Sequence, residues 1–280
     1  MFPAPSVPQV ARALLPRLYS NVVGRGLLGF LMALHGVGAF ALITLGVMLR
    51  KFHVARPVLR PLVAREIYRS GVRLLPMFLF AAVALGFLVI GQTVALLDRV
   101  GAANALLGDI MVIVVVRELG PLLAALLLLA RVGTANVVEL GTARALGEVE
   151  SLEALGIDPV HYFVVPRVIG MAIGISALTV YLILGTLVSG YLWVFVQDVP
   201  LLPGDYFDQL AAALSYRDFI LLALKTSAFG FIISIVTCYH GLAQPLRLDE
   251  VSRATVRAVA QSTVACILLD ALFIVIYLLA

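Results

Sequence analysis

The sequence predicts an all-α integral membrane protein with five transmembrane helices, preceded by a membrane-embedded interfacial helix at the N-terminus. Composition is the first reason: 62% of the 280 residues are hydrophobic and 13% are charged, against about 25% charged in soluble domains. The second is that apolar runs of about 20 residues, enough to cross a hydrocarbon layer about 30 Å thick as a helix, recur along the chain. No alternating ten-residue pattern indicates a barrel.

The apolar runs place the spanning helices in order along the chain. They cover residues 74–97, 107–130, 164–196, 218–240 and 257–279. An earlier run, residues 27–49, is also long enough to cross, but basic residues flank it on both sides, which disfavours crossing. We therefore expect residues 20–50 to form a helix embedded shallowly in the cytoplasmic leaflet, with a true sixth span as the alternative.

Loop charge predicts the orientation. Residues 50–73 carry six arginines and one lysine against Glu66 alone, which marks a cytoplasmic loop by the positive-inside bias. The loops at 98–106 and 197–217 then lie outside, as does the C-terminus, whereas 131–163 and 241–256 face the cytoplasm. The chain thus divides into an N-terminal interfacial helix with a basic linker (1–73) and a five-span membrane domain (74–280).

The cytoplasmic segment 131–163 contains a short amphipathic helix. Apolar residues repeat there at helical spacing, and acidic residues lie mainly on other faces. The apolar set is Leu146, Val149, Leu152 and Leu155, and the acidic set is Glu148, Glu150 and Glu153. Gly156, followed by Asp158 and Pro159, predicts the end of this helix. A helix that short needs a partner surface.

Ionisable residues inside the apolar runs are functional candidates, because a charged side chain at mid-bilayer costs about 2.5 to 3.5 kcal/mol on insertion scales. Arg117 and Glu118 are adjacent and point about 100° apart on a helix, so each should find a partner on another span, such as Lys225 or Asp270, and lock the bundle. The alternative is that the pair binds a lipid headgroup or gates a cavity. Lys225 either meets a phosphate or snorkels to the outer surface, and Asp270 is expected to be structural.

Other residues shape the helices. Pro121 removes one helix hydrogen bond and predicts a kink beside the charged pair, while Gly170 and Gly174 form a small face that lets helices approach closely. Further residues expected to be structural are Gly120, Gly133, Gly141, Asp158 and Pro159. Arg253 and Arg257, at the entrance of the last span, either hold anionic headgroups or simply obey the positive-inside rule.

The run "RELGPLLAALLLLARVGTANVVELGTARALGEVESLEALGIDPVHYFVVPRV", residues 117–168, resembles the signature block of the MlaE/YrbE permeases, the membrane subunits of Mce-type ABC lipid transporters. Weaker similarity continues through "GFLVIGQTVALL", "KTSAFGFIISIVTCYHGL" and "SRATVRAVAQSTVACILLDALF", covering most of residues 60–275. Two departures stand out. Leu146, Gly147 and Glu148 replace a common Thr-Glu-Gln, and "LRLDEVSRAT" replaces a glycine-rich approach to the final span.

The resemblance implies a homodimer of five-span subunits in a bacterial inner membrane. It implies that a coupling helix at 145–157 binds a cytoplasmic ABC ATPase, with Glu148, Glu150, Glu153 and Leu152 at the contact, and that a periplasmic ring of Mce-domain proteins docks outside. The complex would move phospholipid or another hydrophobic lipid between inner and outer membranes and so maintain outer membrane lipid asymmetry. Substrate would pass near residues 75–97 and 257–279, where Gln92 joins the charged residues as a candidate cavity or gating residue.

Several chemistries have no motif in the sequence. No G-x-x-x-x-G-K-[ST] occurs, so we expect a permease subunit that is not itself an enzyme, with ATP and Mg²⁺ bound by the partner ATPase. The four histidines and two cysteines show no metal-ligand spacing, and we expect no catalytic site, metal or cofactor. The net charge of +4 suits anionic leaflets and does not call for nucleic acid.

Two rival functions remain. In an ion-coupled secondary transporter, Glu118, Lys225 and Asp270 would relay protons, although the inverted repeats typical of that class are not visible in the sequence. The other is a nontransporting membrane scaffold for a lipid-binding complex.

Overall fold

The computed structural model describes residues 22–51, 56–94, 108–196, 203–242 and 247–279. These residues form helices and turns, with no strand among them, so the all-α class is confirmed. In chain order the elements are α2 (Val22–Lys51), α3 (Arg56–Ser70), η2 (Val72–Leu74), α4 (Leu75–Leu85), η3 (Gly86–Ile90), η4 (Val112–Leu119), α7 (Gly120–Leu128), η5 (Leu129–Gly133), α8 (Thr134–Ala145), α9 (Glu148–Ala154), η6 (Val160–Val164), α10 (Val165–Val196), α11 (Pro203–Ala213), α12 (Tyr216–Leu242) and α13 (Val251–Leu279).

Five helical stretches in the described residues are long and apolar enough to cross a membrane, which confirms the predicted number of spans. They are Pro57–Val94, Gly108–Ala145, Val160–Val196, Tyr216–Leu242 and Val251–Leu279. The chain divides into two units, Met1–Ile43 and Thr44–Ala280, and all five spans belong to the second. The predicted interfacial segment is helical as α2, with a shorter apolar stretch at His35–Arg50; its place at the membrane surface stays a prediction.

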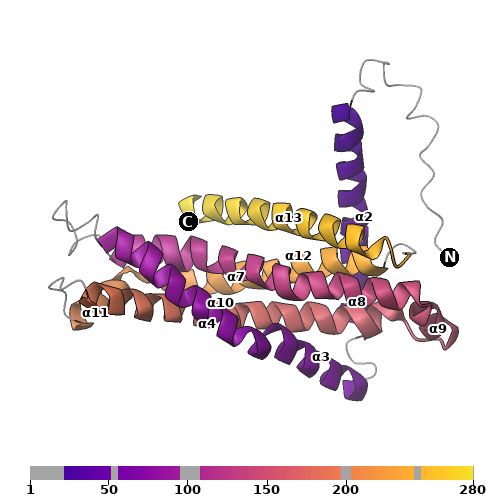
Figure 1. Ribbon diagram of the computed structural model, residues 1–280, viewed down its shortest axis with the longest axis horizontal. Coiled ribbons are helices and arrows are strands. Elements are labelled where there is room, and N and C mark those ends of the chain that lie inside the picture. Colours follow the sequence, from indigo (N-terminus) through magenta and orange to yellow (C-terminus); the bar gives the residue numbers. More distant parts are fainter. Residues whose placement is uncertain (1–21, 52–55, 95–107, 197–202, 243–246, 280) are drawn as a thin grey trace. The chain divides into compact units, whose positions relative to one another are not determined.

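The first spanning helix begins well before residue 74. Part of the predicted basic linker, residues 56–70, is helical: it forms α3, which leads into α4 along a similar direction (Figure 1). Hydropathy alone misses α3 because its buried face is narrow and partly polar: Leu59 and Ser70 are buried, and the Ser70 hydroxyl donates a hydrogen bond to the Gly170 carbonyl at 2.8 Å.

The helix α10 lies at the centre of the five-span unit and packs against α12, α3 and α4. Its glycines allow α3 to approach closely. A Cβ atom added at Gly170 would lie 2.5 Å from Glu66 Cβ, and one added at Gly174 would lie 2.5 Å from Ser70 Oγ. The small face predicted on α10 therefore marks the place where the two backbones cross.

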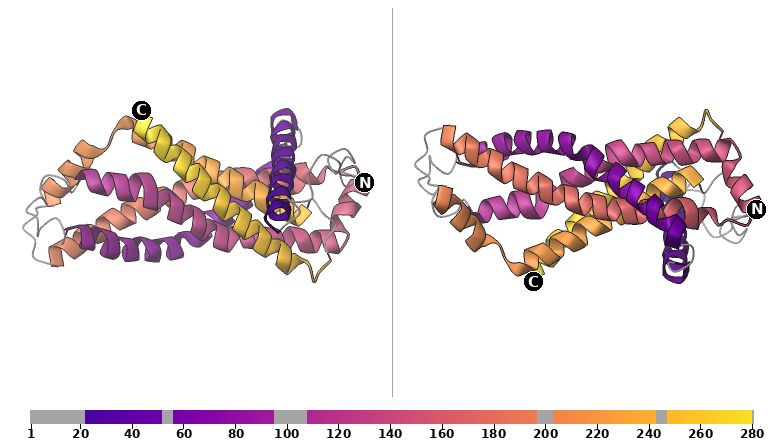
Figure 2. Two further views of the ribbon diagram at one scale, coloured as in Figure 1. Left: turned by 90° about the horizontal axis from the view of Figure 1, so that it is seen from above. Right: turned by 90° about the horizontal axis from the view of Figure 1, so that it is seen from below.

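Two apolar clusters fill the interior of this unit. One contains Phe78, Leu128, Met171 and Phe229, and the other centres on Ile90 and the segments around it. The last helix, α13, packs on α12 and α8 and runs obliquely to the other spans (Figure 2). This crossing brings the C-terminal half of α13 against Arg117 of the second span and Lys225 of the fourth.

The second spanning helix also extends further than predicted. The helix continues through α8 to Ala145, so it includes the first part of the segment 131–163, which was predicted to face the cytoplasm. The short helix α9 then follows at Glu148–Ala154, inside the predicted 145–157. Part of the predicted loop 197–217 forms α11, whereas the predicted loop 98–106 lies outside the described residues.

Candidate functional site

Lys225 is the centre of an ionic network within the spans. Its side chain is fully buried in α12. The ammonium donates hydrogen bonds to Glu118 Oε2 at 3.1 Å and to the Arg117 carbonyl oxygen at 2.8 Å, and it forms an ion pair with Asp270 Oδ1 at 2.7 Å. The second and fifth spans thus supply three oxygens to one nitrogen on the fourth. Lys225 neither snorkels to the outer surface nor lies open to a phosphate in this conformation.

The helix around Arg117 is irregular and leaves the Arg117 carbonyl oxygen available to the Lys225 ammonium. Residues 112–119 form a π-helical stretch, and Pro121 follows in the first turn of α7. Proline has no N–H, so it cannot donate to the carbonyl four residues earlier, which is that of Arg117. Inside a membrane such a freed carbonyl needs another donor, and Lys225 supplies it. The irregular helix predicted from Pro121 is therefore part of the site.

Arg117 turns to a different partner from Glu118. Its Nε lies 2.9 Å from Asp218 Oδ1, and its Nη2 donates to Asp218 Oδ2 at 3.2 Å. The guanidinium also lies over the ring of Tyr277, 5.2 Å from the centroid. Asp218 is buried and accepts a hydrogen bond from the Ser215 N–H at the start of α12, an arrangement that caps the helix.

The four network residues of α12 and α13 follow a simple spacing. Asp218 and Lys225 are seven residues apart on α12, and Asp270 and Tyr277 are seven apart on α13, so each pair shares a helix face. Asp218 and Tyr277 meet Arg117, while Lys225 pairs with both Asp270 and Glu118. Sequence reasoning did not single out Asp218 or Tyr277; their spacing from Lys225 and Asp270 was the available signal.

This network joins the second, fourth and fifth spans through paired charges. Ion pairs of buried groups are costly to break one partner at a time, because the other charge stays unpaired. An arrangement of this kind holds the three helices in one packing, and a change of its pairing requires the helices to move together. Chemically it is suited to locking a conformation, to passing protons among its carboxylates, or to meeting a charged headgroup when it opens.

The second candidate site is α9, which lies beyond the end of the second span. Gly147 precedes it with a left-handed backbone (φ +78°), and Gly156 ends it with φ +76°. The Ile157 N–H donates to the Leu152 carbonyl and the Gly156 N–H to that of Glu153, which is a Schellman end. The predicted stop at Gly156 is confirmed. Asp158 then caps the next helix by accepting from the Val160 N–H at 3.0 Å.

The apolar positions of α9 are not all covered by the chain. Val149 is buried, but Leu146 and Leu155 are 62% and 75% exposed and Ile157 is 41% exposed. Of the three glutamates, Glu150 forms an ion pair with Arg144 at 3.2 Å, while Glu148 and Glu153 are exposed. This end of the molecule therefore presents uncovered leucines beside free carboxylates.

Of the remaining predicted residues, Gln92, Arg253 and Arg257 lie apart from both sites. Gln92 is exposed near the end of the first span, and Arg253 and Arg257 are exposed at the start of α13. Gly120 and Pro121 are buried, and a Cβ atom at Gly120 would lie 2.8 Å from Ile183 Cγ1. A Cβ atom added at Gly133 would lie 2.8 Å from Leu129 Cδ1. Gly141 is buried, and its backbone lies near Gly241 of α12.

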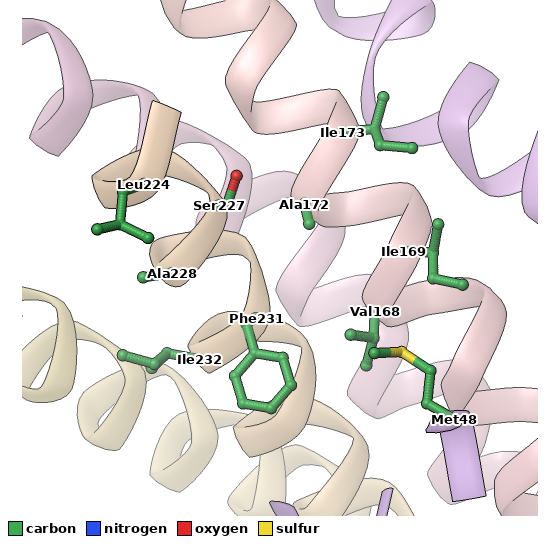
Figure 3. Close-up of a pocket in the computed structure, with 10 residues that line it drawn as sticks. All are labelled: Met48, Val168, Ile169, Ala172, Ile173, Leu224, Ser227, Ala228, Phe231 and Ile232. Atoms are coloured by element: carbon green, nitrogen blue, oxygen red, sulfur yellow. The ribbon is translucent and has the colours of Figure 1, made fainter. Parts of the chain in front are cut away.

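A groove of about 550 Å³ lies between α10 and α12 (Figure 3). Its walls are apolar except for the Ser227 hydroxyl. The lining residues are Met48, Val168, Ile169, Ala172, Ile173, Leu224, Ser227, Ala228, Phe231 and Ile232. None of the charged candidates is among them, so the groove and the Lys225 network are separate features of the described spans.

Comparison with known proteins adds a family match. The model of the family described as Permease MlaE matches residues 63–276. This range contains α9 and every charged residue of the Lys225 network, as well as all but the first turns of the first span.

Individual relatives agree with this match. A probable ABC transporter permease protein of Rickettsia conorii is 30% identical over 254 residues, which cover 88% of this chain and 92% of that protein. The intermembrane phospholipid transport system permease protein MlaE of Haemophilus influenzae is 27% identical, covering 80% of this chain and 87% of that protein. The chloroplastic protein TRIGALACTOSYLDIACYLGLYCEROL 1 of Arabidopsis thaliana is 28% identical, covering 74% and 58%.

Proposed function

Because this chain belongs to the Permease MlaE family, we propose that it is the membrane subunit of an ABC transporter that moves phospholipid or a similar lipid between membranes. A separate cytoplasmic ATPase would bind and hydrolyse ATP with Mg²⁺. Two copies of the chain would enclose the lipid pathway in a bacterial inner membrane, and an Mce-domain ring would receive or supply the lipid outside. The transporter class is supported by the relative from Rickettsia and the lipid class by the relative from Haemophilus.

The observation that carries this proposal is the exposed surface of α9 within the matched region. Leucines left uncovered outside the membrane-spanning stretches are costly in water, at about 25 cal/mol per Å² of apolar surface. Leu146, Leu155 and Ile157 surround a helix too short to be stable alone. Exposed apolar anchors with a rim of carboxylates fit a protein partner, and here that partner is the ATPase.

The Lys225 network supplies the second half of the mechanism. ATP binding in a partner moves lipid only if the two conformations of the permease bind lipid differently. The ion pairs among Glu118, Lys225 and Asp270 hold three spans in one defined arrangement. We infer that ATP-driven movement of α9 repacks these spans and opens this lock, so that the charged groups face the lipid pathway in the other state.

One observation favours a second candidate function. Two carboxylates lie within 3.1 Å of one buried ammonium, which is also what an ion-coupled transporter uses to relay protons. This rival does not need an ATPase or an exposed α9. The two functions therefore differ in whether α9 has a partner.

A pair of matched substitutions tests the proposal. Leu155→Asp places a charge on the exposed apolar surface of α9, whereas Leu248→Asp places one on another exposed leucine (60%) in the loop before α13. We expect Leu155→Asp to abolish copurification of the ATPase with the intact chain and Leu248→Asp to leave it unchanged. Equal retention of the ATPase by both variants would remove α9 as the docking surface.

A further inference from the structure

A second ionic cluster ties together α3, α8 and α10. Glu139 Oε2, on α8, accepts a hydrogen bond from Arg69 Nη1 of α3 at 2.6 Å and another from Arg167 Nη2 of α10 at 3.1 Å. One carboxylate oxygen is therefore shared by two guanidinium groups from different helices. Charge-assisted hydrogen bonds of this kind are about twice as strong as neutral ones.

The groups around Glu139 hold the two arginines in place. Arg167 is 8% exposed, and its Nη1 donates to the Phe163 carbonyl at 2.9 Å. Arg69 Nη2 donates to the side-chain oxygen of Asn136, one turn before Glu139 on α8, and Asn136 is fully buried. Both nitrogens of the Arg69 fork therefore bind α8. Because the guanidinium is planar and rigid, α3 cannot shift along α8 without breaking both of these hydrogen bonds.

This cluster lies next to α9 along the chain. Arg144, near the end of α8, forms an ion pair with Glu150 of α9 at 3.2 Å, and Val149 of α9 is buried. The helix α9 is thus fixed to the end of α8, so a force on α9 is passed to α8. Five residues before Arg144, Glu139 connects α8 to α3 and to the start of α10.

We propose that Glu139, held by Arg69 and Arg167, is a positioning residue that transmits displacement of α9 to the spans α3 and α10. This inference rests on the proposed function, since it requires an ATPase that pulls or pushes α9. Without the Glu139 charge, Arg69 keeps only the longer ion pair with Glu66 at 3.8 Å, and buried Arg167 loses the carboxylate that it pairs with. The ATPase would still dock on α9, but its movement would no longer reach the lipid pathway.

The test uses the complex purified from its native membrane with the proteins that accompany it. The complex is placed in vesicles of phosphatidylethanolamine and phosphatidylglycerol that contain a fluorescent phosphatidylethanolamine. ATP hydrolysis and labelled lipid transferred to acceptor vesicles are measured together. Glu139→Gln is compared with Asp249→Asn, which removes an exposed and distant ion pair with Arg247 at 3.9 Å.

We expect Glu139→Gln to retain the ATPase and its hydrolysis rate while lipid transferred per ATP falls by about fivefold or more, the lower end of coupling between two sites. Arg69→Gln, which leaves the Arg167 to Glu139 contact in place, should lower the same ratio. The double variant should be no worse than the more defective single variant, because both remove one interaction. Asp249→Asn should leave the ratio unchanged.

Two outcomes would overturn the inference. One is an unchanged ratio of lipid to ATP in both Glu139→Gln and Arg69→Gln, even if the melting temperature falls, which would make the cluster purely structural. The other is loss of the ATPase from either variant, which would place the cluster in docking. If the unaltered chain carries no ATPase, the proposed function itself fails, and this result is distinct from both.

Discussion

Lys225 donates a hydrogen bond to the Arg117 carbonyl oxygen at 2.8 Å, and that is the carbonyl which Pro121 cannot serve. A side chain from the fourth span thereby completes the backbone of the second. The same ammonium meets Glu118 and Asp270. The helix irregularity at Pro121 and the ion pairs of Lys225 therefore lie at the same point of the bundle.

Replacement of Lys225 by methionine should destabilise the protein strongly. The substitution keeps the length and apolar stem of the side chain but leaves Glu118 and Asp270 without their counter-charge. Breaking a buried ion pair in this way costs about 3 to 5 kcal/mol. The apparent melting temperature of the purified chain in detergent should fall clearly, and lipid transport should be lost.

A neutral version of the network provides the control for that result. In the triple variant Lys225→Met, Glu118→Gln, Asp270→Asn, no charge remains to be unpaired, so most of the lost stability should return. Transport should stay absent, because the lock no longer distinguishes two states. Full recovery of transport by the neutral triple variant would show that the charges only hold the fold.

Pro121→Ala should separate helix stability from function. Alanine restores an N–H that competes with Lys225 for the Arg117 carbonyl, and it is favoured over proline in a helix interior by about 3 kcal/mol. We expect a higher melting temperature together with slower ATP-driven lipid transfer. A variant that transports lipid at the original rate would show that the irregular helix has no part in the mechanism.

Asp218→Asn tests the ion pair between Arg117 and Asp218 separately from the contacts of Lys225. Asparagine still caps α12 through Ser215, but the charge opposite Arg117 is lost. Hydrogen bonds to charged groups contribute about 1.5 to 3 kcal/mol, so the free energy of unfolding should fall by that order. Thermal unfolding of the variant and of the unaltered chain measures this loss of stability. A loss no larger than that caused by Asp249→Asn, on the exposed loop, would contradict the prediction.

Tyr206 of α11 gives a prediction for alkaline pH. Burial raises the pKa of its phenol to about 12, and the hydroxyl donates to the Leu187 carbonyl at 3.2 Å. Since the folded-state pKa lies above the unfolded value of about 10, the stabilisation is present below pH 10 and is lost as the pH rises toward 12. Tyr206→Phe should lose this pH dependence, measured by thermal unfolding across that range; an unchanged profile would exclude Tyr206 as its source.

The number of spans and the position of α9 followed from the sequence because they depend on local signals. Apolar run length fixes the spans, and Gly156 fixes the end of α9 through its backbone. The helix α3 was missed since its arginines lower its hydropathy, while its burial depends on Gly170 and Gly174, about a hundred residues away. Tertiary contacts overrode the local pattern there.

Pairing of the charges was only partly predictable. The cost of leaving a charge in lipid predicted that Arg117 and Glu118 would each find a partner on another span, and Lys225 is the partner of Glu118. The choice of Asp218 by Arg117 depends on how α12 packs against the π-helical stretch. The cluster at Glu139 was not predicted, because its arginines lay in segments read as loops or flanks and carried no spacing signal toward α8.

The most direct test of the account is purification of the tagged chain from its native membrane in mild detergent, followed by mass spectrometry of stoichiometric partners. The account predicts an ATPase with a Walker motif, retained by the unaltered chain and by Leu248→Asp but lost from Leu155→Asp. An intact chain that carries no ATPase would contradict it and would favour the ion-coupled use of Glu118, Lys225 and Asp270.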